Sequence, residues 1–174
     1  EDAGFVASGQ LQVAETEVEL ETLRERVQLL QSHGFTHEEL VDAQQVRELV
    51  PAIAPHIIGG IWVQGDGHAL PYRAVTAFRL AAQRAGVVVH EGMRVERIDY
   101  NAGRWNVTSG PHHFTASHVV NAAGAWAGDF AAQAGDAVPV QAVGRRLMIT
   151  HRAPPFVNPV LGATGRALSL KQFA

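Results

Sequence analysis

The chain has 174 residues, of which 47% are hydrophobic and 18% charged, with a formal net charge of −3. This composition is typical of a globular protein and lacks the basic excess of a nucleic-acid-binding chain. Cysteine is absent, which excludes disulfides, thiolate metal sites and a cysteine nucleophile within these residues. No apolar run approaches the roughly 18 residues of a membrane helix. We therefore expect no membrane span, no nucleic-acid partner and a cytoplasmic location.

The first third of the sequence predicts a strand followed by two capped helices. Apolar and polar residues alternate over Gly9–Val13, which is typical of a strand. Capping-box patterns at 16–19 and 42–45 each precede a helical pattern. The first helix is expected to end at Gly34 and the second just before Pro51.

The middle of the chain predicts a strand and then a helix. The strand covers Ile57–Val63, where two adjacent glycines at 59–60 indicate a bulge or a close approach of another backbone. The helix begins at Pro71, presents a row of alanines and ends at Gly86.

Short apolar segments separated by turns follow this helix and predict a β-meander, a further strand, and a helix over 125–134. The run 168–174 resembles a strand cut off in the middle, which together with the start at Glu1 predicts that the chain is a fragment. Strands and helices mix along the chain, so the fold class is α/β with a second, separate sheet. The strands expected after the helix are 87–90, 94–100, 104–109, 113–115, 118–121 and 146–151.

The segment V119-V-N-A-A-G-A-W126 places three alanines and a glycine, and then a tryptophan, between an expected strand and an expected helix. Ala122, Ala123 and Gly124 leave the backbone N–H groups and the positive end of the helix dipole open to a ligand, which suits a phosphate or a nucleotide. The same residues also allow a helix to pack closely on a sheet. Taken alone, the segment favours packing over ligand binding.

Several motifs of common enzymes are missing. The sequence contains no G-x-G-x-x-G, no P-loop, no H-E-x-x-H and no G-x-S-x-G. No carboxylate lies at ligand spacing from His112, His113 or His118, so no metal site is predicted. His68 lies in a turn from which it could reach a ligand, but a solvated loop histidine is the more common case. Arg145 and Arg146 would point to opposite faces of a strand, so only one of them could meet a substrate carboxylate.

The order of several segments resembles the FAD-dependent amine and amino-acid oxidoreductases, the family of glycine oxidase, sarcosine oxidase and D-amino-acid oxidase. That family pairs a Rossmann-like FAD-binding domain, which carries a β-meander, with a substrate domain built on a mostly antiparallel sheet. The resemblance implies substrate-domain portions at 1–64 and 138–174 and an FAD-domain portion at 65–137. The segments that carry it are G9-Q-L-Q-V-A, G65-D-G-H-A-L-P-Y-R, A81-A-Q-R-A-G-V-V-V, V95-E-R-I, V119-V-N-A-A-G-A-W, V138-P-V-Q and L147-M-I-T.

The same resemblance implies a set of FAD contacts. Val95 matches the position whose backbone meets the adenine, and Ala122, Ala123, Gly124 and Trp126 match the corner beside the adenosine and pyrophosphate. No catalytic residue is assigned, because the reactive groups of this family vary between members.

The implied function is removal of a hydride from the carbon beside the nitrogen of a small amino acid or secondary amine, with FAD as the acceptor. A flavin-dependent 2-hydroxyacid dehydrogenase is an alternative, and so is a non-catalytic domain or subunit that binds no flavin. Because these 174 residues lack a G-x-G-x-x-G loop, we expect them alone to bind FAD weakly or not at all and to be inactive.

Overall fold

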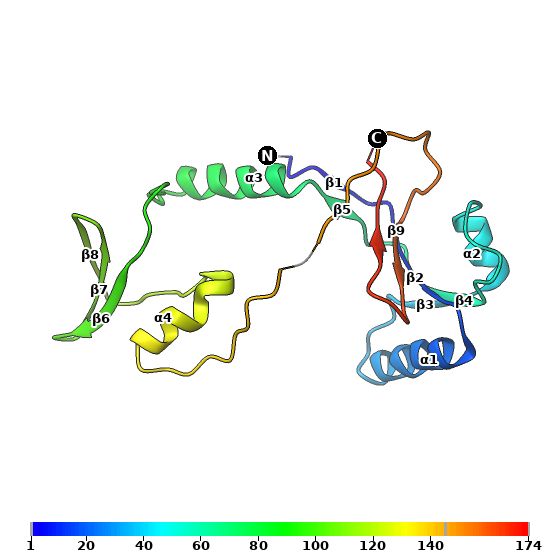
Figure 1. Ribbon diagram of the computed structural model, residues 1–174, viewed down its shortest axis with the longest axis horizontal. Helices are drawn as coiled ribbons and strands as arrows, with labels where there is room; N and C mark the ends of the chain where they lie inside the picture. The colour runs from blue at the N-terminus through cyan, green and yellow to red at the C-terminus, as the bar shows by residue number, and fades with distance from the viewer. Residues whose placement is uncertain (1, 145, 174) are drawn as a thin grey trace. The chain divides into compact units, whose positions relative to one another are not determined.

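The computed structural model describes residues 2–144 and 146–173. These residues form two compact units (Figure 1). The first unit comprises 1–87 together with 151–174, and the second unit comprises 88–150. Both contain helices and strands, as the α/β prediction requires. Within the described ranges, no helix is long and apolar enough to cross a membrane.

The first unit is built on a five-stranded sheet in the order β10-β9-β2-β4-β3. The central strand β2 pairs antiparallel with β4 on one side and parallel with β9 on the other. The outer pairs β3/β4 and β9/β10 are antiparallel. The predicted separate, mostly antiparallel sheet is therefore confirmed. Its strands are β2 (Gln10–Ala14), β3 (Glu39–Asp42), β4 (Gly59–Val63), β9 (Val160–Ala163) and β10 (Ser169–Leu170).

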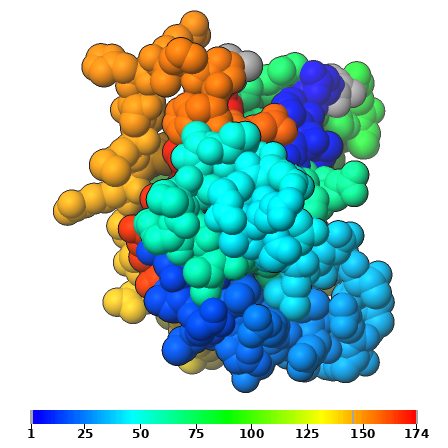
Figure 2. Space-filling model, turned by 90° about the vertical axis from the view of Figure 1, so that its right-hand side faces the viewer, coloured from blue at the N-terminus to red at the C-terminus, as the bar shows by residue number. Residues whose placement is uncertain are grey.

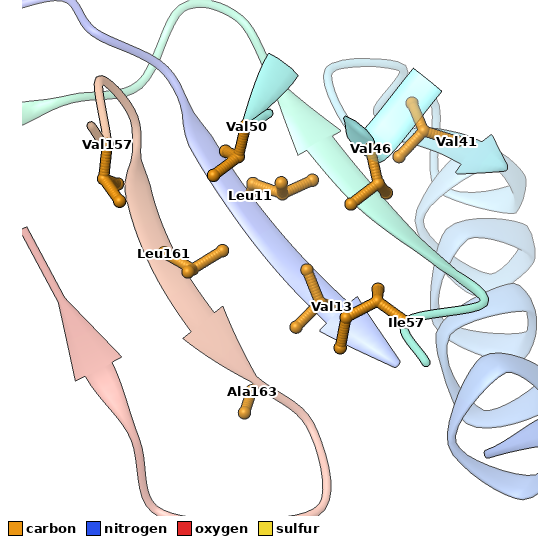
Figure 3. Packing of buried hydrophobic residues seen from close by; sticks show 9 residues of the cluster. All are labelled: Leu11, Val13, Val41, Val46, Val50, Ile57, Val157, Leu161 and Ala163. Atoms are coloured by element: carbon orange, nitrogen blue, oxygen red, sulfur yellow. The ribbon is translucent and has the colours of Figure 1, made fainter. Parts of the chain in front are cut away.

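Alternate residues of β2 point to opposite faces of this sheet, and each face has its own helix. On one face, the fully buried Leu11 and nearly buried Val13 pack with Val46 of α2 (Ala43–Leu49). Figure 3 shows these side chains converging between β2, β9 and the α2 segment. The cluster consists of Leu11, Val13, Val41, Val46, Val50, Ile57, Val157, Leu161 and Ala163.

The other face of the sheet is covered in part by α1 (Glu17–Ser32). Ala14 of β2 and Ile61 of β4 pack there against α1, which buries one row of side chains at helical spacing. In the space-filling view of Figure 2, α2 and the residues after it (cyan) lie above α1 (blue). The α1 side chains in this cluster are Leu20, Leu23 and Val27.

Helices α1 and α2 begin at the caps that the sequence predicts. Asp42 and Gln45 form a complete capping box at α2. At α1 the Thr16 hydroxyl accepts from the Glu19 N–H at 3.3 Å, but the Glu19 carboxylate accepts from the N–H of Glu15 at 2.7 Å. The α1 cap therefore reaches one residue further back than a standard box.

Two glycines of the first unit mark close backbone approaches. A Cβ on Gly60 would collide with the carbonyl oxygen of Gln12. The pairing of β2 with β4 is continuous across this point, so the close approach is confirmed and the alternative bulge is wrong. Gly67 likewise allows contact with the Val6 carbonyl, where β1 (Phe5–Val6) pairs with β5 (His68–Ala69).

Helix α3 (Pro71–Arg84) starts at Pro71 as predicted. All fourteen of its residues are described, and none of them is buried. Its apolar side chains Val75 and Phe78 are 67% and 76% exposed.

The second unit contains the predicted β-meander. Its strands β6 (Arg97–Asn101), β7 (Arg104–Ser109) and β8 (His112–Ala116) pair antiparallel in sequence order. A 3₁₀ turn, η1 (Gly124–Trp126), leads into α4 (Ala127–Gln133). The Gln133 side chain accepts a hydrogen bond from the Ile98 N–H at 2.9 Å, which ties α4 to the meander.

Three predicted strands are wrong: residues 87–90, 118–121 and 146–151 are not strands. A strand needs a neighbour for its backbone groups, and none of the described strands pairs with these segments. The predicted strand at 168–174 is confirmed only at Ser169–Leu170. Strands β1, β3, β5 and β9 were not predicted.

Candidate functional site

Residues 119–126, the small-residue corner, form an open surface of the second unit. Ala122 and Gly124 are exposed and Ala123 is partly buried. Gly124 has a φ of +57°, and a Cβ built on it would meet no atom within 4 Å. The backbone here takes a left-handed conformation that favours glycine. Trp126 is 67% exposed, so its ring offers an apolar surface beside this opening.

Asn121 determines the shape of this corner. Its Oδ1 accepts from the Ala123 N–H at 3.2 Å, and its Nδ2 donates to the Ala127 carbonyl at 2.9 Å. The Trp126 N–H donates to the Ala123 carbonyl at 3.1 Å. The chain therefore turns before α4 begins, and the expectation of a strand running directly into a helix is wrong. Asn followed by small residues is a turn signal that the sequence offered.

Val95 lies two residues before β6 and is partly buried. The next residue, Glu96, donates its N–H to the Thr108 carbonyl at 2.9 Å, so the pairing with β7 begins there. Helix α4, which follows the corner, contacts β6, which follows Val95. The five predicted cofactor residues thus belong to one compact unit, joined by the α4–β6 packing. Their role in binding FAD stays a prediction.

The histidines and arginines considered from sequence lie elsewhere. His112, His113 and His118 are exposed, and the described residues hold no group of three or more His, Asp or Glu side chains that could bind a metal. His68 is partly buried and stacks on Phe173, with ring centroids 5.4 Å apart. Arg146 belongs to no strand, and Arg145 lies outside the described residues.

A charged pair that the sequence did not predict lies in the first unit. Arg26 of α1 donates from Nε and Nη2 to the two carboxylate oxygens of Glu38, at 2.8 Å and 2.5 Å. The Glu38 side chain is 7% exposed and the Arg26 side chain 62%. Hydrogen bonds from Arg26 hold the pKa of Glu38 below its usual value against the opposing effect of burial. Hydrogen bonding to Glu38 raises the pKa of Arg26. Arg26 and Glu38 are twelve residues apart, and no sequence motif predicts an ion pair at this spacing.

This pair borders a cavity of about 310 Å³ between α1 and the sheet. Residues of β2 and β4 form one side of the cavity, residues of α1 form another, and Thr164 lies at its edge. The cavity is on the sheet face of Ile61, because Gln12 pairs directly with Ile61 across the β2–β4 ladder. The lining includes Gln10, Gln12, Arg26, Glu38, Ile61 and Thr164.

Comparison with known proteins identifies the family. The family of FAD dependent oxidoreductases known as DAO matches residues 1–169. The chain belongs to this family. The resemblance inferred from segment order is thereby confirmed.

Individual relatives agree with the family assignment. The chain is 25% identical over 149 residues to dimethylglycine dehydrogenase, mitochondrial, of Homo sapiens, which covers 84% of this chain and 17% of that protein. It is 32% identical over 111 residues to glycine oxidase of Bacillus licheniformis, covering 64% of this chain and 30% of that protein. Both matches span well under half of the relative's length.

A solved structure shares the fold. The crystal structure of L-proline dehydrogenase from P. horikoshii superposes with a TM-score of 0.76 at 22% sequence identity. The match covers 93% of this chain and 44% of that one. The mixed α/β architecture of this chain is therefore shared with that solved structure. The chain corresponds to less than half of the matched protein.

Proposed function

We propose that the protein containing this chain oxidises a small amino acid or secondary amine, with FAD as the hydride acceptor. The observation that carries the proposal is the family match over residues 1–169. The names of two relatives, glycine oxidase and dimethylglycine dehydrogenase, point to amines that also carry a carboxylate.

The small-residue corner is the proposed contact with the adenosine and pyrophosphate of FAD. Its geometry fits such a group, because Gly124 has free space where a side chain would be and Ala122 is exposed. Short side chains let a ligand approach those backbone N–H groups that the turn leaves free, because the N–H groups of Ala123 and Trp126 are already bonded within it. The exposed Trp126 ring adds an apolar surface of the kind that stacks on a planar group. Val95 is proposed to contact the adenine.

This assignment gives FAD and the small-residue corner separate roles. Bound FAD would supply the hydride acceptor for oxidation of the carbon beside the amine nitrogen, which would give an imine that water hydrolyses. The corner of this chain positions the nucleotide end of the cofactor. The proposed domain portions are 65–137 for FAD and 1–64 with 138–174 for the substrate.

We also propose a cytoplasmic location. Fractionation of cells that express the tagged protein tests this proposal.

The cofactor assignment is tested on the purified full-length protein. We expect yellow flavin absorbance, and release of FAD on denaturation. Ala122→Glu, which places a carboxylate at an exposed position of the corner, should lower the FAD content strongly through clash and repulsion of the pyrophosphate. Ala132→Glu, at an exposed position of α4 outside the corner, is the matched control and should retain FAD.

Protein that purifies without any flavin would contradict the oxidoreductase assignment. Equal FAD content in Ala122→Glu and Ala132→Glu would contradict the placement of the corner alone. Oxidation of small 2-hydroxy acids, with no activity on amines, would select the dehydrogenase alternative.

A further inference from the structure

The cavity beside the Arg26–Glu38 pair has the polar groups of a binding site. Gln10 and Gln12 lie on adjacent same-face positions of β2, and both border the cavity. Gln10 opposes Val63 and Gln12 opposes Ile61, so the amides stand next to an apolar surface. An apolar wall with a few converging polar groups is the usual composition of a small-molecule site.

Arg26 reaches this cavity in a fixed orientation. Its Nε and Nη2 are both engaged by Glu38, whose carboxylate is more than nine-tenths buried. The remaining nitrogen, Nη1, bonds to none of the described residues. A guanidinium already held flat by one carboxylate loses little further freedom when it binds a second acceptor. Nη1 therefore remains available to donate to a ligand bound beside the pair.

The two glutamines supply further donors. Among the described residues, the Gln10 side chain has no hydrogen-bond partner, and Gln12 Nε2 lies 3.5 Å from the Thr164 hydroxyl, which is a long contact. A Cβ on Gly162 would collide with Gln12 Oε1. The glycine thus makes room for the Gln12 amide on this face of the sheet.

The charge balance favours an anion over a cation. Arg26 and Glu38 are the two charged residues of the lining, and each oxygen of Glu38 is already bonded to Arg26. Free donors remain on Arg26 and the amides, whereas the single carboxylate of the lining is already paired with Arg26. Guanidinium and amide donors suit the planar, two-oxygen carboxylate group. A volume of about 310 Å³ limits the ligand to a small molecule.

We infer that this cavity binds the carboxylate of a small organic acid, with Arg26 Nη1 and the amides of Gln10 and Gln12 as donors. The carboxylate site stands on the geometry of the first unit alone.

Acetate is the probe, and the full-length protein is titrated with it by calorimetry. We expect saturable binding at one site. The double variant Gln10→Leu/Gln12→Leu keeps the Arg26–Glu38 pair and similar side-chain volumes, and should bind acetate about tenfold more weakly, as expected for the loss of hydrogen bonds to a charged group. Gln28→Leu, an exposed glutamine of the same helix as Arg26, should bind like the wild type.

A second variant guards against a folding defect. Gln12→Glu is nearly isosteric and should abolish acetate binding through repulsion, while its circular dichroism spectrum stays unchanged. Unchanged acetate affinity in both the double variant and Gln12→Glu, or no saturable binding by the wild type, would overturn the inference.

Flavin absorbance of the same preparations separates this inference from the proposed function. Flavin-free protein that binds acetate as described would support the site and contradict the oxidoreductase. If the protein contains flavin but the double variant and Gln12→Glu bind acetate as tightly as the wild type, only the carboxylate site would be contradicted.

Discussion

The two compact units differ most in how much apolar surface they bury. In the first unit, two clusters fill both faces of the sheet around β2. In the second unit, Ile98 and Ala131 are the buried apolar residues among those described. Met148 and Ile149, by contrast, are each 89% exposed. A five-stranded sheet with a helix on each face supplies its own core, whereas a three-stranded meander with one short helix supplies little.

This difference explains where the sequence patterns were reliable. Apolar periodicity around the five-stranded sheet corresponds to burial, because the partner surfaces belong to the same unit. Helix α3 of that unit has no such partner surface among the described residues, and its apolar side chains stay exposed. In the second unit equally apolar segments remain exposed. An apolar run therefore indicates burial only where its partner surface is present. The following experiments test this contrast between the two units on the full-length protein.

Leu11→Ala should have the largest effect. The Leu11 side chain is fully buried at the centre of the first cluster, so its truncation leaves a cavity and should lower the free energy of unfolding by about 3 kcal/mol. Urea denaturation measures the change. Leu29→Ala, at a position that is 60% exposed, is the control and should cost about 0.5 kcal/mol or less.

Ile98→Ala applies the same test to the second unit. Ile98 is 7% exposed, but few other buried side chains surround it. We expect a smaller loss of about 2 kcal/mol, seen by hydrogen exchange as faster exchange of the β6 amides. A loss equal to that of Leu11→Ala would remove the contrast between the units.

Glu38→Gln tests the charged anchor of the first unit. Removing the ionised partner of Arg26 should cost about 1.5 kcal/mol near neutral pH, a modest value because the Arg26 side chain is 62% exposed. The folded-state pKa of Glu38 is lowered. The pair's contribution is therefore fully present above the unfolded-state pKa and is lost as pH falls through the folded-state pKa.

The pH dependence supplies the check on this variant. Urea denaturation of the wild type and Glu38→Gln across the acidic range should show two curves that converge as pH falls. A difference that stays constant down to the lowest pH would mean that the cost arises from packing and not from ionisation.

Asp42→Ala should have the smallest effect of the series. It removes the complete capping box of α2 and should lower stability by about 1 kcal/mol. Thr16→Ala removes the single, longer side-chain contact at α1 and should cost less. Thermal unfolding ranks the two variants, and a larger loss for Thr16→Ala would contradict the comparison of the caps.

Local signals predicted much of the first unit. Asp42 with Gln45, Pro71 and the glycines at 59–60 act within a few residues of themselves, so the sequence identifies their structural roles directly. Strand β9 escaped prediction because it is a short segment between a Pro-rich stretch and a turn, and it becomes a strand only by pairing with β2. Such long-range pairing leaves no local pattern.

The candidate sites divide in the same way. The small-residue corner was identified because its composition is unusual over eight consecutive residues, although the turn imposed by Asn121 was not foreseen. The Arg26–Glu38 pair and the cavity beside it unite residues from distant segments. Ordinary charged and amide residues give no signal until the fold brings them together.

The parallel pairing of β2 with β9 also has a consequence for how the protein folds. Gln12 and Thr164, which meet beside this pair, are 152 residues apart in the sequence. The whole second unit lies between the two partner segments. Closing so long a loop is entropically costly and slow. During synthesis, the β9 edge of β2 therefore stays unpaired until residues 160–163 have been made and have left the ribosome.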